Sequence, residues 1–224
     1  PERSRVGSTR GCALQAGALP EGEAAWGTRV AAGCPDAQLA LVETLEPDQR
    51  LDLLNSLGFF SPPEIGLEAF SSTALESWPE DELEALGTGA LQISPLQLAR
   101  AAAALSNGGE LPALSLATGV NTPQAGWVLL PPATSAVSSL PAGGAQRAAR
   151  LLALAEQPVW EASGLAPLGE EGMVAWYLGG TLPENAAAAR VVVILLEDAP
   201  AAAAQQAGRA LLSAALNIDL SSAP

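Results

Sequence analysis

The hydrophobic and polar positions change period along the chain. In the first half they follow a helical spacing: apolar residues recur after Asp36 at Leu39, Val42 and Leu45, which predicts a helix capped by Asp36. Residues 48–58 predict a second helix, which Gly58 ends. The residues before this region, 1–30, show little periodicity, and we expect an irregular arm there.

The clearest helix signal covers residues 94–107. Ser94 is a good N-cap, Pro95 suits the first helical position, and Gln97 completes a capping box. The Asn107-Gly108-Gly109 sequence is typical of a left-handed stop.

Residues 110–146 are rich in proline and glycine, with short strands expected at 114–117 and 127–129. A helix is expected over 146–156.

The last third favours strands. Apolar, β-favouring runs occupy 159–163, 174–178 and 190–196, with turn residues between them. Short connections favour an antiparallel meander, in which we expect Trp160 and Trp176 to pack across neighbouring strands. An Ala-rich helix over 200–216 follows.

Together these elements predict an α+β fold, with an antiparallel sheet flanked by helices that include a C-terminal one, and a helical region inserted or preceding. We expect a single domain over 1–224. It would comprise an irregular arm (1–30), a mainly helical part (31–109), and a sheet with flanking helices (110–224).

Composition narrows the chemistry. All ten basic residues are arginine, and the chain has no lysine and no histidine. Ser-His-Asp and Cys-His catalysis and imidazole-ligated zinc sites are therefore excluded, as are P-loops, Schiff bases and Ser–Lys pairs. We expect no metal and no cofactor. The net charge of −14 argues against nucleic acid as a partner.

Three groups of segments match a known pattern. The first runs from Gly87-Thr88-Gly89 through Ser94-Pro95-Leu96-Gln97 to Ser106-Asn107-Gly108-Gly109. The second is Ala162-Ser163-Gly164, followed by Ala175-Trp176-Tyr177-Leu178-Gly179 and Val191–Glu197. The third is Cys34-Pro35-Asp36, with Leu57-Gly58-Phe59 downstream. Taken in chain order, these segments resemble the transpeptidase domain of penicillin-binding proteins. That resemblance implies a β-lactamase/transpeptidase-like fold.

The departures from that family lie at its catalytic positions. The family's K-T-G motif becomes Ala162-Ser163-Gly164, and its S-x-N motif becomes Cys34-Pro35-Asp36 or, in another register, Gly33-Cys34-Pro35. Residues 7–11 (GSTRG) superficially resemble the nucleophile motif, but glycine stands at the lysine position, so Ser8 is not assigned as a nucleophile. We therefore expect a degenerate cleft formed by Cys34, Asp36, Ala162, Ser163 and Gly164, with no catalytic residue.

The two cysteines, Cys12 and Cys34, allow two interpretations. A disulfide between them would close a loop with 21 intervening residues and stabilise the protein by about 3 kcal/mol. In a cytosolic protein they would instead be two buried thiols. The family resemblance implies an extracytoplasmic location, in the periplasm or on the outer face of the membrane, with an anchor upstream of Pro1. That location favours the disulfide.

The resemblance leaves more than one function open. The first hypothesis is a catalytically inactive domain that binds peptidoglycan or cell-wall synthesis proteins. The second is an active D,D-transpeptidase or β-lactam-binding domain whose nucleophile segment lies upstream of Pro1. A weaker third is an acidic interaction domain that only inherited the fold. Glu161 and Glu197 are further candidates for an acid pair.

Overall fold

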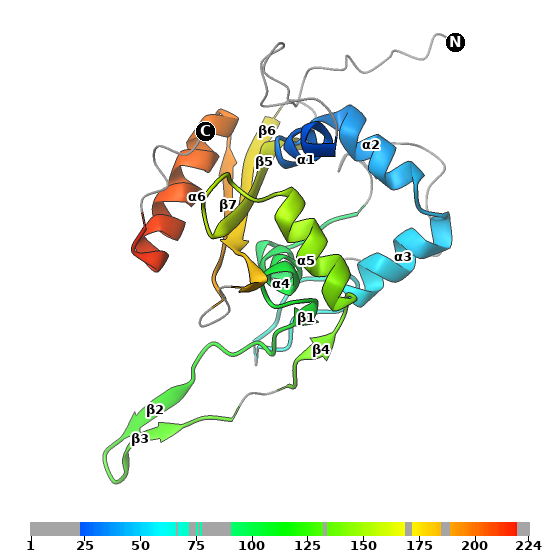
Figure 1. The fold of residues 1–224 in the computed structure, drawn as a ribbon. Helices are drawn as coiled ribbons and strands as arrows, with labels where there is room; N and C mark the ends of the chain where they lie inside the picture. Colours follow the sequence, from blue (N-terminus) through cyan, green and yellow to red (C-terminus); the bar gives the residue numbers. More distant parts are fainter. Residues whose placement is uncertain are drawn as a thin grey trace.

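The computed structural model describes residues 23–65, 67–71, 75, 77, 91–131, 134–168, 172–184 and 189–218. These residues form a three-layer α+β arrangement (Figure 1). The central layer is an antiparallel sheet of β5 (Val159–Leu168), β6 (Gly172–Thr181) and β7 (Val191–Glu197), in the order β5-β6-β7. The predicted meander and the α+β class are confirmed.

One face of the sheet is covered by α6 (Ala201–Leu216). Ala204, Gly208 and Leu212 recur every four residues and are buried, so they form the stripe that packs on the strands. The helix ends at Asn217, whose φ of 57° is left-handed. The predicted terminal helix is thus confirmed almost to the residue.

The other face is covered by helices from the first half of the chain. In this layer α4 (Pro95–Ser106) contacts β6 and β7, while α1 (Glu23–Ala31) contacts β5 and α5 (Ala142–Leu151). Trp160 fills the layer between Ala102 of α4 and Ala149 of α5. Its indole Nε1 donates a hydrogen bond to Ser106 Oγ at 2.9 Å, so the buried ring has a partner for its polar atom.

The capping signals explain why α4 lies where it does. Ser94 Oγ accepts from the Gln97 backbone N–H at 3.2 Å, and Gln97 Oε1 accepts from the Ser94 N–H at 3.1 Å. After α4, Gly108 and Gly109 have φ values of +63° and +98°. The predicted capping box and glycine stop are both confirmed.

The remaining elements complete the outline. Next to α1 lies α2 (Pro35–Glu43), followed by α3 (Pro47–Ser56), which Gly58 ends with φ +78° as predicted. Two short pairs lie outside the main sheet: β1 (Glu110–Leu111) with β4 (Val137–Ser138), and β2 (Gly119–Thr122) with β3 (Gly126–Leu129). The β2–β3 hairpin projects away from the body (Figure 1). No helix among the described residues is long and apolar enough to cross a membrane.

Several boundary predictions were wrong. The expected irregular arm over 1–30 contains α1 from Glu23 onward; residues 1–22 lie outside the described residues. The helix expected at 146–156 is α5, which starts earlier, at Ala142. The two glycines near its start predicted a helix break, but the packing of α5 against its neighbours stabilises the helix there. Residues 114–117 form no strand; the chain pairs at β2 instead.

Two local predictions also need correction. The N-cap of α2 is Cys34, and Asp36 lies in its first turn. Trp160 and Trp176 share a sheet face, but the register places them opposite Gly180 and Gly164 respectively. Each indole therefore packs over a glycine instead of over the other indole: a Cβ at Gly164 would lie 2.8 Å from Trp176 Cζ2.

Candidate functional site

The turn between α1 and α2 lies directly against strand β5. Gly33, in this turn, has φ +65°, a left-handed conformation that glycine adopts most readily. A Cβ at this position would lie 2.9 Å from the carbonyl oxygen of Ser163 and 3.2 Å from Gly164 Cα. The structure thus brings the Cys34–Asp36 segment to the Ala162–Gly164 strand, as the resemblance implies, and leaves no room for a side chain at Gly33.

Cys34 is buried at this junction. Its exposed fraction is 2%, and it packs with Ala32 and Ala37. The residue takes part in a disulfide, so its sulfur is not a thiolate nucleophile. Cys12, the only other cysteine of the chain, lies outside the described residues, and its pairing with Cys34 stays a prediction.

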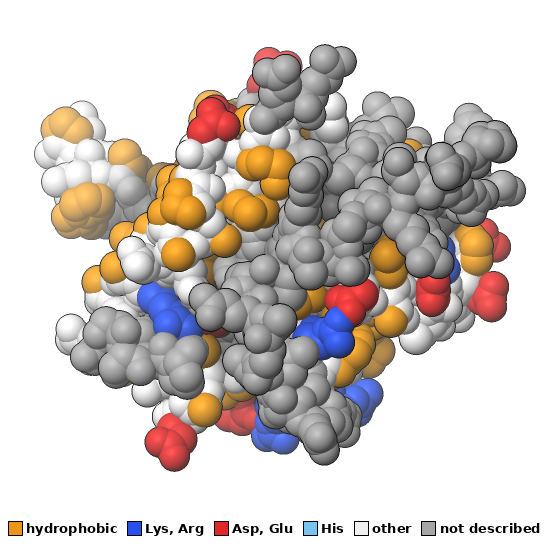
Figure 2. Space-filling view, turned by 90° about the horizontal axis from the view of Figure 1, so that it is seen from above, with side chains coloured by type: hydrophobic (Ala, Val, Ile, Leu, Met, Phe, Trp, Pro, Cys, Tyr) orange, Lys and Arg blue, Asp and Glu red, His pale blue; other side chains and the backbone are white. Residues whose placement is uncertain are grey.

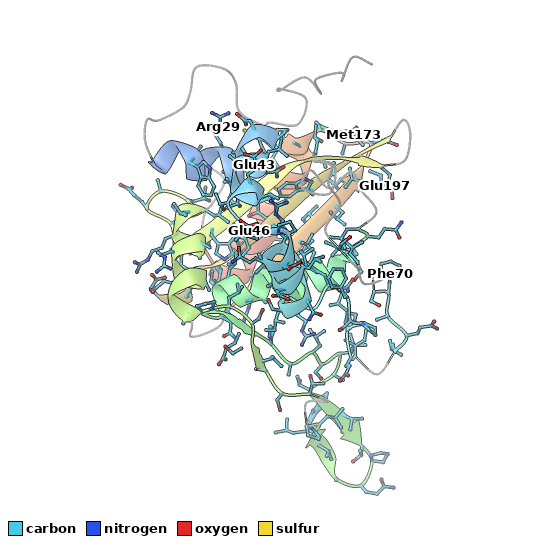
Figure 3. All side chains as sticks on the ribbon, turned by 90° about the vertical axis from the view of Figure 1, so that its right-hand side faces the viewer. Arg29, Glu43, Glu46, Phe70, Met173 and Glu197 are labelled. Atoms are coloured by element: carbon cyan, nitrogen blue, oxygen red, sulfur yellow. The ribbon has the colours of Figure 1, made fainter. Side chains whose placement is uncertain are left out.

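Asp36, at the second polar position of the S-x-N-like segment, is held by its own surroundings. One carboxylate oxygen accepts from the Ala37 N–H at 2.9 Å, and the other forms an ion pair with Arg29 of α1. The two side chains are 36% (Arg29) and 47% (Asp36) exposed, so the pair contributes at most about 1 kcal/mol. Figure 3 shows Arg29 at the same end of the molecule as Met173 of β6.

The residues of the K-T-G-like segment, Ala162 to Gly164, lie on both faces of β5. Successive side chains point to opposite faces of a strand, and Ala162 and Gly164 share the face of Trp176, toward Gly33. Ser163 is paired with Tyr177 and so points to the α6 face. Ala162 is 8% exposed. The only hydroxyl of the segment is turned to the opposite face.

The opposite face of β5 carries a buried charge cluster that the sequence interpretation missed. Glu161 accepts from Arg209 Nε at 3.0 Å and from Arg209 Nη2 at 2.7 Å, with Gln205 Nε2 at 3.0 Å. The two charged side chains are only 8% and 13% exposed. Glu161 therefore pairs with α6 and not, as the acid-pair hypothesis held, with Glu197. A signal existed: a carboxylate inside an apolar strand needs a partner, and Arg209 is the one basic residue of the terminal helix.

Tyr177 lies beside this cluster. Its ring packs against α6 at Gly208, where an added Cβ would overlap the ring. The hydroxyl is buried and, within the described residues, has no hydrogen-bond partner. Burial raises the pKa of Tyr177, and the negative charge of Glu161 raises it further. The phenol is thus kept neutral and holds α6 against the sheet.

A second contact joins two of the motif segments. Gln97 is 2% exposed, and its side-chain amide donates to the carbonyl oxygens of Phe59 at 2.8 Å and Ser61 at 3.2 Å. The glutamine of the Ser94–Gln97 motif therefore fixes the loop that follows Gly58. Phe70, further along this loop, is exposed and lies on the side shown in Figure 3.

Other candidate residues are not placed. Ser8 and the Gly87–Gly89 turn lie outside the described residues, so their relation to the cleft stays a prediction. In the described part of the chain, no group of three or more His, Cys, Asp or Glu residues could hold a metal ion.

Comparisons with known proteins concern the sequence region and the fold. The family model "Penicillin binding protein transpeptidase domain" matches residues 37–146. A search of curated proteins finds no match.

Among solved structures, penicillin-binding protein A from M. tuberculosis, as an imipenem acyl-enzyme complex, has TM-score 0.69 and 22% identity. The match covers 83% of this chain and 46% of that one. A peptidoglycan glycosyltransferase from Burkholderia ambifaria has TM-score 0.60 and 19% identity, covering 87% and 64%. The D,D-transpeptidase domain of a peptidoglycan glycosyltransferase from Eggerthella lenta has TM-score 0.65 and 18% identity, covering 85% and 54%.

The chain spans from about half to two thirds of the length of these three relatives. Identities this low show the shared fold. Together with the sequence match over residues 37–146, that fold supports a penicillin-binding protein transpeptidase domain.

Proposed function

We propose that this chain is a catalytically inactive transpeptidase domain that acts as a binding or scaffolding module in cell-wall assembly. The observation that carries the proposal is the face of β5 toward Gly33. It presents Ala162 and Gly164, and the α1–α2 turn lies against it. By the sequence resemblance, these two residues correspond to the lysine and the glycine of the family's K-T-G motif.

The chemistry of the described cleft supports inactivity. A serine transpeptidase needs a base to take the proton of its nucleophile. An alanine cannot attract the carboxylate of a substrate, and arginine, the only cation in this chain, is a poor proton acceptor. Asp36 is in an ion pair and Cys34 is in a disulfide. Losing an activating base costs several orders of magnitude in rate.

The proposed binding role rests on the parts of the fold that the chain retains. Among the described residues, Gly33 still lies against Ser163 and Gly164, and Gln97 still ties α4 to the loop after Gly58. We propose peptidoglycan or a cell-wall synthesis protein as the partner, and an extracytoplasmic location for the domain. A disulfide at Cys34 is in keeping with that location, since such bonds persist in oxidising compartments.

Acylation by a labelled penicillin, measured by intact mass, tests the inactivity. The expected result is no covalent adduct at high β-lactam concentration. Penicillin-binding protein A from M. tuberculosis, solved as an imipenem acyl-enzyme, serves as the positive control. A stoichiometric adduct on this chain would overturn the proposal in favour of an active domain.

Sedimentation with purified peptidoglycan tests the binding role separately. We expect the folded chain to sediment with the polymer, and the heat-unfolded chain to bind it no better than an unrelated acidic protein. If the chain stays in the supernatant, a cell-wall protein remains the partner to test, by cross-linking in cells.

A further inference from the structure

The β2–β3 hairpin stands out from the rest of the molecule by its surface. Among the described residues, seven of the fifteen exposed large hydrophobic side chains lie within residues 116–137: Leu116, Val120, Trp127, Val128, Leu129, Leu130 and Val137. Leu129 is 84% exposed and Trp127 is 75% exposed. A contiguous exposed apolar surface of this kind marks an interaction site.

The hairpin is a defined element. Four residue pairs join its strands, from Gly119 with Leu129 to Thr122 with Gly126. At the tip, the Ala125 N–H donates to Thr122 Oγ1 at 3.1 Å, and Gly126 has φ +66°, as tight hairpin loops with a left-handed glycine require. The apolar side chains are therefore held in place on a ribbon.

Both faces of this ribbon are apolar. Trp127 and Leu129 alternate with Val128 along β3 and so share one face; there a Cβ at Gly119 would contact both of them, at 3.7 and 3.8 Å. Val120 and Val128 are direct partners on the other face and are 44% and 38% exposed. A site for one folded partner needs only one such face, whereas a ribbon apolar on both faces fits an apolar medium that surrounds it.

The lack of charged residues in this part of the sequence also favours an apolar medium around the hairpin. The sequence has no charged residue between Glu110 and Arg147, although the chain carries 34 charged residues and a net charge of −14. In Figure 2 the part that projects at the upper left shows only hydrophobic and uncharged side chains, while red and blue side chains lie on the body. An uncharged surface offers no ion pairs to a charged macromolecule, and its insertion beside lipid carries no cost of desolvating a charge.

We propose that the β2–β3 hairpin contacts a lipid bilayer surface, with Trp127 and Leu129 among the acyl chains near the headgroups. Tryptophan is favoured at this depth because its ring is apolar and its indole N–H is polar. The two-stranded ribbon has unpaired backbone groups along both outer edges, which would be costly in the hydrocarbon interior. The contact is therefore interfacial and not a span. It is independent of the proposed function.

Sedimentation with phosphatidylcholine vesicles tests this proposal. We expect the intact chain to bind, with an affinity insensitive to salt because no charge is involved. The double variant Trp127→Glu/Leu129→Glu should bind at least about tenfold more weakly. Leu211→Glu, on α6 and 54% exposed, is the matched control and should bind as the unchanged chain does. Circular dichroism verifies that all variants are folded.

Fluorescence gives a second readout. Vesicles should shift the tryptophan emission to the blue, and Trp127→Phe should bind similarly but lose most of that shift. No binding by the intact chain, or equal binding by the double glutamate variant, would overturn the proposal. A dimer that forms without lipid and disappears in the double variant would also overturn it, since a second copy would then cover the hairpin.

Discussion

The two faces of strand β5 differ in the charged side chains that they carry. On the α6 face, Glu161 keeps a buried, fully hydrogen-bonded ion pair with Arg209. On the face toward Gly33, Ala162 is buried and has no polar group in its side chain. A buried charge is costly unless it is partnered. The comparison shows that, among the described residues, β5 carries a buried ion pair on the face that joins it to α6 and small side chains on the face toward Gly33.

Breaking the buried ion pair on the α6 face should have the largest effect on stability. Arg209→Met leaves Glu161 buried without its cation, and we expect a loss of about 3–5 kcal/mol in the free energy of unfolding, measured with urea. The double variant Glu161→Leu/Arg209→Met should recover most of that loss. Arg150→Met, which breaks the exposed pair with Glu184, is the control and should cost about 1 kcal/mol or less. A loss of that small size for Arg209→Met would contradict the comparison.

The second largest loss of stability is expected from disturbing the packing of α6 on the same face of the sheet. A Cβ at Gly208 would collide with the Tyr177 ring, so Gly208→Ala should destabilise by about 1–3 kcal/mol. Gly144→Ala in α5, where the nearest atom would be 3.9 Å away, should be stabilising by up to about 1 kcal/mol. Thermal unfolding of both variants checks the contrast, and equal shifts would refute the close approach of α6 to Tyr177.

Tyr177 adds a pH dependence to this face. Its pKa is raised above 10.0 by burial and by Glu161, so the folded state binds the phenolic proton more tightly than the unfolded state. The resulting stability is full below pH 10 and declines as the pH rises above it. Tyr177→Phe should weaken that decline. Because the hydroxyl has no hydrogen-bond partner among the described residues, the variant should change stability at pH 7 by less than about 1 kcal/mol. An unchanged alkaline profile would contradict this assignment.

The smallest effect is expected at the cleft. Asp36→Asn keeps the shape of the side chain but removes the exposed ion pair with Arg29. We expect a loss of about 1 kcal/mol or less in urea unfolding and no gain of penicillin acylation. Acylation of this single variant would show that the cleft holds its other catalytic groups.

The sequence predicted those parts of the fold that rest on local signals. The capping box at Ser94, the stop at Gly108 and Gly109, and the alternation of β5–β7 are properties of neighbouring residues. The α1 helix was missed because its nine residues, which include three alanines and one glycine, show weak periodicity. Packing against β5 and α5 stabilises it.

The site was predicted in part. The resemblance led to Cys34, Asp36 and Ala162–Gly164, and the structure brings the two segments together at Gly33. The Glu161–Arg209 pair was missed because its partners are 48 residues apart and no local rule joins them. The face to which Ser163 points depended on the strand register, which the sequence left open.

Intact mass after exposure to a labelled penicillin tests the central claim most directly. The account predicts that the mass of the chain stays unchanged after prolonged incubation at high β-lactam concentration, both for the natural sequence and for Ala162→Lys, since one lysine alone restores neither nucleophile nor base. A mass increase of one penicillin per unmodified chain would contradict it, because the cleft would then hold a working nucleophile.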